Sequence, residues 1–160
     1  MPEVEELKAY YSAFGFLPPD PQTIKNHLDS IRKSLNYHLG PCKAGESLLD
    51  YGGGYGLYAK AARDLGWDVA LFDYDIGALD FAARELGLNR QTADLASISD
   101  ESFDVIWAFH VAEHWRCVDD SFNDLDRLVK PGGRLILATP NARSWEKYLR
   151  SSHFRNYLKA

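Results

Sequence analysis

Two kinds of segment alternate along the chain. In one kind, apolar residues recur at helical spacing, and in the other, nearly every residue is apolar. Stripes with apolar residues three or four positions apart run over residues 4–14, 24–35, 57–65, 76–86 and 118–129, with a weaker one at 142–158. Short apolar runs between these stripes predict strands at 46–50, 67–73, 90–94, 103–110 and 134–140. The run at 90–94 is the weakest. Apolar strands that alternate with single helices predict a doubly wound α/β fold, with a mainly parallel sheet and helices on both faces.

The segment before residue 45 differs from the rest because it carries helical stripes but no strand-like run. Asp20 or Thr23 can cap the helix with the stripe at 24–35, and the "LGP" at residues 39–41 predicts its end. We interpret residues 1–45 as a helical cap or lid on a domain formed by residues 46–160, and not as a second domain. In doubly wound sheets ligands bind outside the carboxyl ends of the strands, so functional residues are expected in the turns that follow them.

Composition and charge exclude several classes of protein. A chain of 160 residues with 46% hydrophobic and 26% charged residues is typical of one globular domain. Its formal net charge of −5 and its 18 scattered Lys and Arg disfavour a nucleic-acid target. Cys42 and Cys117 have neither metal-site spacing nor the density of a disulfide scaffold, which favours a reducing compartment. The chain has no apolar stretch long enough to span a membrane, and its acidic start "MPEVEE" is unlike a signal peptide. We therefore expect a cytoplasmic protein that does not associate with a membrane.

The stretch "LLDYGGGYG", residues 48–56, follows the first predicted strand and raises three interpretations. A hinge or tight strand-to-helix turn would use glycine for its freedom of φ. A dinucleotide site would need Gly-x-Gly-x-x-Gly, whose third glycine falls on Leu57. A cradle for another adenosine-bearing ligand fits the alternate spacing of Asp50, Gly52, Gly54 and Gly56. A carboxylate there suits a cationic ligand better than a diphosphate, which it would repel.

Four stretches in order resemble the motifs of class I S-adenosylmethionine-dependent methyltransferases, from about residue 46 to residue 141. They are "LLDYGGGYG", "LFDYD", "TADLASISDESFDVIWAFHVAEHW" and "DLDRLVKPGGRLILATPN". The "EH" after the fourth strand and the "TPN" after the fifth are similar to the branch that includes ubiquinone-type and other small-molecule methyltransferases. The resemblance implies a Rossmann-like sheet of strand order 3-2-1-4-5, S-adenosyl-L-methionine as cofactor and methyl transfer to a small-molecule acceptor.

The resemblance also implies the cofactor-binding residues, which are Asp50, Gly52, Gly54, Gly56, Asp73, Asp94 and Leu95. Asp50 would face the amino group of the methionine part, and the glycine backbone would run beneath it. Asp73 would take both ribose hydroxyls, whereas Asp75 is the better cap for the next helix. Asp94 would meet the adenine amino group, with Leu95 against the ring; the alternative for Asp94 is a solvated loop carboxylate.

The catalytic group is less closely defined, because in-line methyl transfer needs positioning more than acid–base chemistry. If the acceptor is a hydroxyl, His110 or His114 after the fourth strand is the natural base. Together with Glu113 they could also ligate a metal, although we assign none. A third interpretation is that Glu113 and His114 only cap and pack the short turn. Trp107 and Trp115 are expected to be packing residues, and Trp115 could also wall the acceptor site.

The end of the chain departs from the family, which has two further strands after the fifth, the last one antiparallel. Nothing beyond residue 141 is typical of either, so we expect a shortened form, a naturally minimal enzyme or a degenerate chain that binds cofactor poorly. The strand at 133–139 would then be a sheet edge, and a homodimer could cover it. Three functions remain open: a small-molecule methyltransferase, a non-catalytic methyltransferase-like scaffold, and a dinucleotide-binding oxidoreductase, which Leu57 disfavours.

Overall fold

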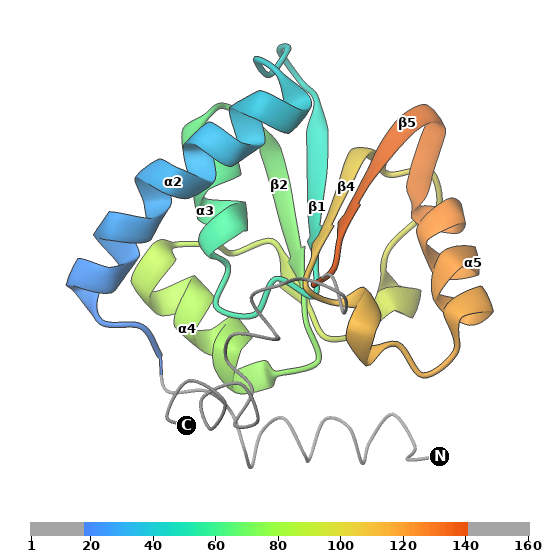
Figure 1. Cartoon of the computed structure of the whole chain (residues 1–160). Coiled ribbons are helices and arrows are strands. Elements are labelled where there is room, and N and C mark those ends of the chain that lie inside the picture. The colour runs from blue at the N-terminus through green and yellow to red at the C-terminus, as the bar shows by residue number, and fades with distance from the viewer. Residues whose placement is uncertain (1–17, 141–160) are drawn as a thin grey trace, which may run out of the picture.

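The computed structural model describes residues 18–140, and within this range five parallel strands form a single sheet (Figure 1). The strands are β1 (Ser47–Tyr51), β2 (Asp68–Phe72), β3 (Gln91–Thr92), β4 (Phe103–Phe109) and β5 (Val129–Ala138). Their order across the sheet is β3-β2-β1-β4-β5, which confirms the predicted order 3-2-1-4-5. The order reverses beside β1, so the turns after β1 and β4 meet at the switch point where such sheets bind ligands.

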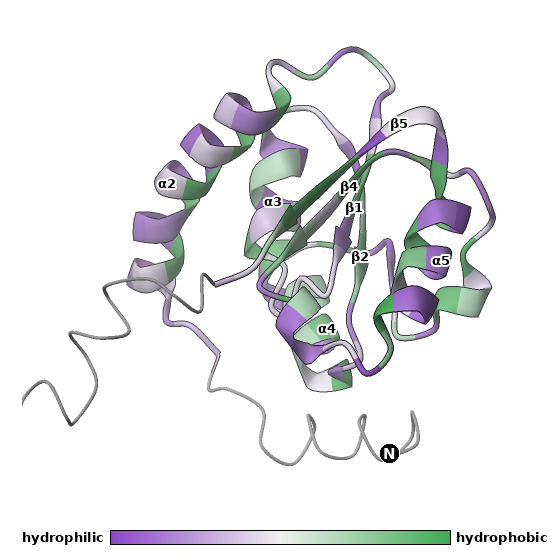
Figure 2. Cartoon of the chain, turned by 45° about the vertical axis from the view of Figure 1, so that its right-hand side comes forward, coloured by the Kyte–Doolittle hydropathy of each residue, from purple (hydrophilic) through white to green (hydrophobic). Residues whose placement is uncertain are grey.

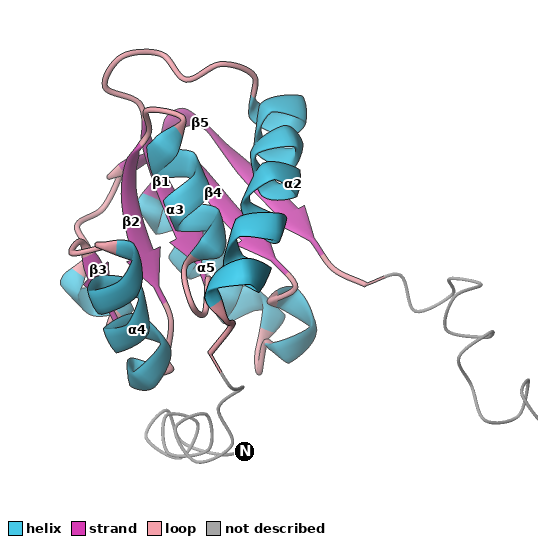
Figure 3. Cartoon of the chain, turned by 90° about the vertical axis from the view of Figure 1, so that its left-hand side faces the viewer, coloured by secondary structure: helices cyan, strands magenta, loops and turns pink. Residues whose placement is uncertain are grey.

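Helices cover both faces of the sheet, as the sequence predicted (Figure 3). One face carries α2 (Pro21–Leu39), α3 (Leu57–Asp64) and α4 (Ile76–Leu86), and the other carries α5 (Val118–Leu128). Two short 3-10 turns, η1 (Leu95–Ser97) and η2 (Ala112–His114), follow β3 and β4. Figure 2 shows hydrophobic positions on the sides of the helices that face the sheet. Helices on both faces therefore bury the strand side chains that point to either face.

Helix α2 packs onto the sheet through the stripe that predicted it. Ile31 and Leu35 are buried in the same cluster as Leu48 of β1 and Trp107 of β4. Its N-terminus is capped by Asp20, whose carboxylate accepts hydrogen bonds from the backbone of Gln22 and Thr23 at 3.0 Å each. Gly40 follows its last residue, so both predicted ends are confirmed. The helices predicted at 4–14 and 142–158, and any strand after β5, lie outside the described residues.

Three details of the predicted elements are wrong. Val129 was assigned to the helix at 118–129, but it pairs with Phe103 as the first residue of β5, and α5 ends at Leu128. Val118 and Phe122 were expected in the buried stripe of α5, yet they are 54% and 42% exposed, because only its C-terminal half packs closely on the sheet through Leu125 and Leu128. The third strand is two residues long instead of five, because the chain leaves the sheet edge after Thr92 to form η1.

The residues "KPGG" form an irregular first part of β5, between the pairs of Val129 with Phe103 and of Arg134 with Val105, and a polar cluster holds them at the amino ends of β1 and β4. Asp104 Oδ2 accepts hydrogen bonds from Lys130 Nζ, Ser47 N and Ser47 Oγ, each at 2.8 Å. These bonds lower the pKa of Asp104 to about 2, chiefly through the Lys130 ammonium. The cluster therefore fastens three neighbouring strands at the end of the sheet remote from the glycine loop.

Candidate cofactor and acceptor site

Asp50 lies at the carboxyl end of β1 with its carboxylate directed at the first turn of α3. Its side chain is only 2% exposed, and Oδ2 accepts a 2.9 Å hydrogen bond from the backbone of Ala59. Gly56 at the start of α3 offers no side-chain cap, so the Asp50 carboxylate satisfies one of the free N–H groups of this helix. Burial raises the pKa of Asp50 to about 7; the Ala59 bond opposes this rise and the charge of Asp73 adds to it. Asp50 is therefore a carboxyl group that can change charge near neutral pH.

The glycines after Asp50 lie in a tight loop in which each has a different surrounding. A side chain on Gly52 would run into Val111, and one on Gly53 would overlap the Asp50 carboxylate. A side chain on Gly56 would run into Leu88. Gly54, in contrast, has a φ of +52° and nothing within 4 Å of the position a Cβ would take. The loop is thus closely packed at three glycines, and there is open space beside Gly54.

Asp73 follows β2 and lies against the same loop. Its Oδ2 accepts a 2.7 Å hydrogen bond from Gly54 N, and its Oδ1 accepts one of 2.8 Å from Asp75 N. Burial raises its pKa, against the effect of these two bonds. Asp75 caps α4 through Ala78 N at 3.2 Å, so the cap was predicted correctly and Asp73 is left for another role. Two carboxyl groups therefore lie against one glycine loop, Asp50 at Gly53 and Asp73 at Gly54.

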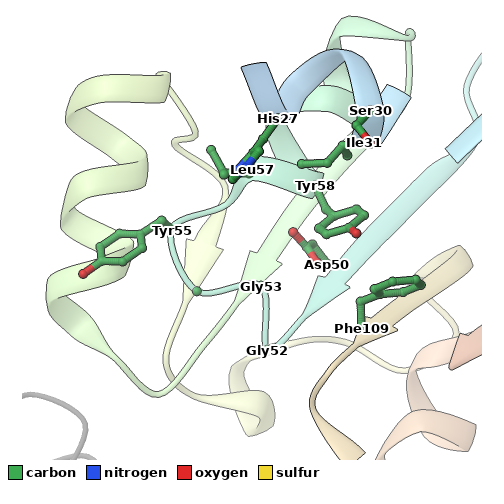
Figure 4. A pocket seen from close by; sticks show the side chains of 11 residues that line it. His27, Ser30, Ile31, Asp50, Gly52, Gly53, Tyr55, Leu57, Tyr58 and Phe109 are labelled. Carbon is green, nitrogen blue, oxygen red and sulfur yellow. The ribbon is translucent and has the colours of Figure 1, made fainter. Parts of the chain in front are cut away.

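A cavity of about 460 Å³ opens beside this loop (Figure 4). The carboxyl end of β1 and the following turn supply Asp50, Gly52, Gly53, Gly54 and Tyr55 to its wall, and the first turn of α3 supplies Leu57 and Tyr58. Phe109 of β4 supplies a further part, and α2 closes it with His27, Ser30 and Ile31. In Figure 4 the Asp50 carboxylate, the Tyr58 ring and the Phe109 ring face one another, whereas Tyr55 points towards α4, where its ring contacts Phe81 at 5.1 Å.

An aromatic group supports the floor of this cavity. The rings of Tyr58 and Phe109 lie 5.2 Å apart, and Phe109 stacks on Trp107 at 4.9 Å with an interplanar angle of 5°. Trp107 is fully buried, which confirms its expected packing role. Burial and the Asp50 carboxyl raise the pKa of Tyr58, so its hydroxyl remains a hydrogen-bond donor in this environment. The cavity thus combines a buried acidic group with aromatic faces, which is a suitable lining for a cationic ligand.

No pattern in the sequence marked Tyr58 of α3, Phe109 of β4 or the α2 residues that line the cavity. His27 and Ser30 flank the apolar stripe of α2 three positions apart, a spacing that marks one helix face but no chemistry. They line the cavity only because α2 packs beside α3 and the glycine loop in the folded chain. Tyr58 belongs to an amphipathic helix in which an aromatic residue is usual, so no local signal distinguished it.

Asp94 and Leu95 follow β3. The end of β2, where Asp73 lies, separates them from the glycine loop after β1. Asp94 is exposed, and its carboxylate accepts a 3.0 Å hydrogen bond from Ala96 N as the cap of η1. Leu95 is 8% exposed and packs in the core beneath α5. Neither residue is part of the cavity wall formed by the glycine loop and α2. The predicted adenine contacts of both residues stay predictions.

His110 and His114 follow β4, whose last residue, Phe109, lines the cavity, but neither histidine is part of the cavity wall. His110 has a φ of +57° and a side chain that is 60% exposed, with Nδ1 3.7 Å from Glu113 Oε1. Glu113 Oε2 accepts a 3.1 Å hydrogen bond from Thr139 Oγ1, whereas η2 has no side-chain cap and no buried residue, so the interpretation that Glu113 and His114 only cap and pack the turn stays a prediction. Across residues 18–140, these side chains and their neighbours form no group of three or more that could hold a metal ion. A positive φ at a non-glycine residue beside the site marks His110 as a functional candidate.

Sequence comparison places these features in a known family. Residues 25–158 match the methyltransferase domain family. The chain belongs to that family. The resemblance to class I S-adenosylmethionine-dependent methyltransferases is thereby confirmed, and S-adenosylmethionine is the cofactor that membership implies. Within residues 18–140, no helix of this methyltransferase-family chain is long and apolar enough to cross a membrane.

Three curated relatives carry different names. The chain is 30% identical over 135 residues to the ribosomal protein L11 methyltransferase of Cupriavidus metallidurans, covering 75% of this chain and 43% of the relative. It is 28% identical over 144 residues to the malonyl-[acyl-carrier protein] O-methyltransferase of Enterobacter lignolyticus, covering 87% and 56%. It is 30% identical over 112 residues to the ubiquinone biosynthesis O-methyltransferase of Coxiella burnetii, covering 66% and 47%. The chain spans about half the length of these relatives.

Solved structures agree with the fold. The PH0226 protein of Pyrococcus horikoshii superimposes with a TM-score of 0.66 at 21% identity, covering 93% of this chain and 69% of that one. An S-adenosylmethionine-dependent methyltransferase from Mesorhizobium loti gives a TM-score of 0.58 at 25% identity, covering 70% and 55%. The doubly wound architecture predicted from the sequence is therefore that of known methyltransferase-like structures.

Proposed function

We propose that this chain binds S-adenosylmethionine along the carboxyl ends of β1, β2 and β3 and transfers its methyl group to a small-molecule acceptor. The observation that carries the proposal is the hydrogen bond from Gly54 N to Asp73 Oδ2, beside the buried Asp50. This bond brings an open glycine backbone and two carboxyl groups to one side of the sheet. When bound, the cofactor supplies a methyl group on a cationic sulfur, and acidic and aromatic walls stabilise such a charge.

Each predicted residue then has a role that its position allows. Asp50 would accept a hydrogen bond from the methionyl ammonium, and the backbone at Gly52, Gly54 and Gly56 would leave room for that part and the ribose. Asp73 would exchange its bond with Gly54 N for the two ribose hydroxyls. Further along the sheet edge, Asp94 would face the adenine amino group, with Leu95 beneath the ring. The chain's contribution to rate is then mainly to hold the reacting atoms in line and to exclude water.

The acceptor would enter between α2 and the turn after β4. Helix α2 supplies His27 and Ser30 to the cavity wall, which supports the proposal that this helix, within the segment 1–45, covers the site. If the acceptor is a hydroxyl, His110 or His114 would take its proton, and His110 lies within reach of the Glu113 carboxylate at 3.7 Å. The relatives' names include two O-methyltransferases and one methyltransferase of a ribosomal protein. We favour a small molecule because the cavity beside the glycine loop, of about 460 Å³, has the size of a small-molecule site, and a protein acceptor is the alternative.

Calorimetric titration with S-adenosylhomocysteine and, separately, with NAD tests the proposal. We expect heat only with the first ligand, and a loss of that heat in Asp73→Ala. The control variant is Asp75→Ala, which removes a neighbouring carboxylate whose hydrogen bond goes to α4. Absence of heat with S-adenosylhomocysteine at millimolar concentration would instead favour a non-catalytic scaffold, and heat with NAD would favour a dinucleotide enzyme.

A further inference from the structure

Arg127, in the last turn of α5, fastens the segment that follows β3. Its Nη2 donates a 2.9 Å hydrogen bond to the carbonyl of Leu95, and its Nη1 donates one of 2.8 Å to the carbonyl of Ile98. Nη1 also lies 2.7 Å from Asp100 Oδ1. A planar guanidinium with several fixed donors can hold two carbonyls in one geometry, which a lysine ammonium does less well. One side chain of α5 therefore fixes both ends of η1.

The fixed segment begins with Asp94, the residue expected to meet the adenine amino group. Hydrogen bonds within the segment set its local shape: Asp94 N donates to Thr92 Oγ1 at 3.0 Å, and Ser97 Oγ donates to the Asp94 carbonyl at 2.6 Å. The first bond ties Asp94 to β3, and the second lies within the segment, so neither reaches α5. Its polar tie to α5 is the Arg127 guanidinium, which supplements the apolar contact of Leu95 with the core.

We propose that Arg127 is a positioning residue for the adenine end of the cofactor site, acting through η1 on Asp94 and Leu95. This inference rests on the proposed function, since it names what holds one end of the proposed site. The carbonyl bonds carry the effect. Asp100, whose side chain is 71% exposed, adds an ion pair that water weakens. Removing the guanidinium takes away the side-chain tie of η1 to α5. Asp94 is then held only from the β3 side, through Thr92, so its carboxylate can shift relative to Asp73 at the end of β2.

The experiment compares two ligands that differ only at the purine. S-adenosylhomocysteine carries the exocyclic amino group, and S-inosylhomocysteine carries an oxygen there, which a carboxylate at Asp94 would repel. We expect calorimetry to show that the wild type prefers the adenine ligand. In Arg127→Met, affinity for S-adenosylhomocysteine should fall by about tenfold, the size expected for lost charge-assisted hydrogen bonds. Affinity for the inosine ligand should fall less, so the preference for adenine shrinks.

Two further variants separate positioning from general destabilisation. Arg84→Met removes a 75% exposed arginine of α4, whose partner Asp80 is 3.8 Å away, and should leave both affinities unchanged. Arg127→Lys should retain part of the preference, and it replaces Arg127→Met if circular dichroism shows that the methionine variant does not fold. In an Asp94→Asn background the effect of Arg127→Met on purine preference should largely disappear, because both residues act through the same contact.

The outcomes are distinguishable. An equal loss of affinity for both ligands in Arg127→Met, or no loss, overturns the positioning role while leaving the proposed function intact. An undiminished effect in the Asp94→Asn background also overturns it. A wild-type protein that binds neither ligand overturns the proposed function and this inference together.

Discussion

The backbone N–H of Gly54 donates a 2.7 Å hydrogen bond to Oδ2 of Asp73, and this bond joins the loop after β1 to the carboxyl end of β2. The two residues are 19 positions apart, with a helix and a strand between them. Their contact makes the glycine loop and the acidic turn one site. In the proposed function, a ribose hydroxyl would have to replace this internal hydrogen bond at Asp73 Oδ2.

Gly54→Ala should impair binding more than folding. The positive φ of Gly54 makes any side chain cost about 1–2 kcal/mol of folding free energy, while its Cβ meets no protein atom. The same methyl group would enter the space proposed for the ligand, so affinity for S-adenosylhomocysteine should fall by at least about tenfold. Calorimetry and chemical denaturation measure the two effects. Gly45→Ala, with a φ of +85° and equally open surroundings, is the control. An equal loss of affinity in both variants would contradict the cradle.

Ligand binding should depend on pH through Asp50. Because burial raises the pKa of its carboxyl to about 7, Asp50 is mostly protonated at pH 6 and mostly charged at pH 8. A cationic ammonium favours the charged form, so affinity for S-adenosylhomocysteine should rise by up to about tenfold from pH 6 to pH 8, with proton release on binding. Titration in buffers of different ionisation enthalpy measures that proton. In Asp50→Asn, the affinity for S-adenosylhomocysteine should no longer change with pH between pH 6 and pH 8. If this variant keeps the pH profile of the wild type, another group titrates, and Asp73 is the first candidate.

Asp104→Asn should destabilise the amino end of the sheet. The Asp104 carboxylate holds Lys130 and both polar groups of Ser47, so we expect a loss of about 1–2 kcal/mol at pH 7. Since the folded pKa is lowered to about 2, the advantage of the wild type is present above pH 4 and is lost as the pH falls towards 2. Urea denaturation at pH 7 and pH 3 tests this. Asp68→Asn, which breaks an exposed pair with Arg90, should cost less than about 1 kcal/mol.

His110 should affect turnover and not cofactor binding. Asn tolerates the positive φ found at this position, so His110→Asn should fold and bind S-adenosylhomocysteine as the wild type does. If His110 is the base, production of S-adenosylhomocysteine with a hydroxyl acceptor found by screening should fall by about 100-fold or more. His27→Asn and His114→Asn, tested in the same assay, identify which histidine acts. Full turnover in all three variants would exclude a histidine base at this site.

Strand β5 forms an edge of the described sheet, and residues 133–139 are proposed to pair with a second copy. Leu137 on this strand is 38% exposed. Light scattering should show a dimer at high protein concentration, and Leu137→Lys should shift it towards the monomer by placing like charges at the junction. Phe122→Lys, at a 42% exposed position of α5, is the control. A clean wild-type monomer at high concentration would remove the dimer proposal.

The sequence by itself determined the order and kind of the elements, because each has a pattern that depends only on neighbours along the chain. The alternating runs predicted the parallel sheet, and Asp20 and Asp75 marked the starts of their helices. The even spacing of glycines after Asp50, together with Leu57, indicated the class of ligand. Such local signals failed where packing decides, as at Val129, which joins β5 because it pairs with Phe103.

Only the tertiary structure decided which residues meet at the site. His27 and Ser30 reach the cavity because α2 packs against α3. Tyr58 and Phe109 reach it because α3 packs on the face of the sheet and β4 pairs with β1. The charge state of Asp50 likewise follows from burial, a property that no pattern in "LLDYGGGYG" contains. Contacts between residues distant in sequence depend on how helices pack on the sheet. The sequence alone therefore identified the glycine loop but not the residues of α2, α3 and β4 that line the cavity beside it.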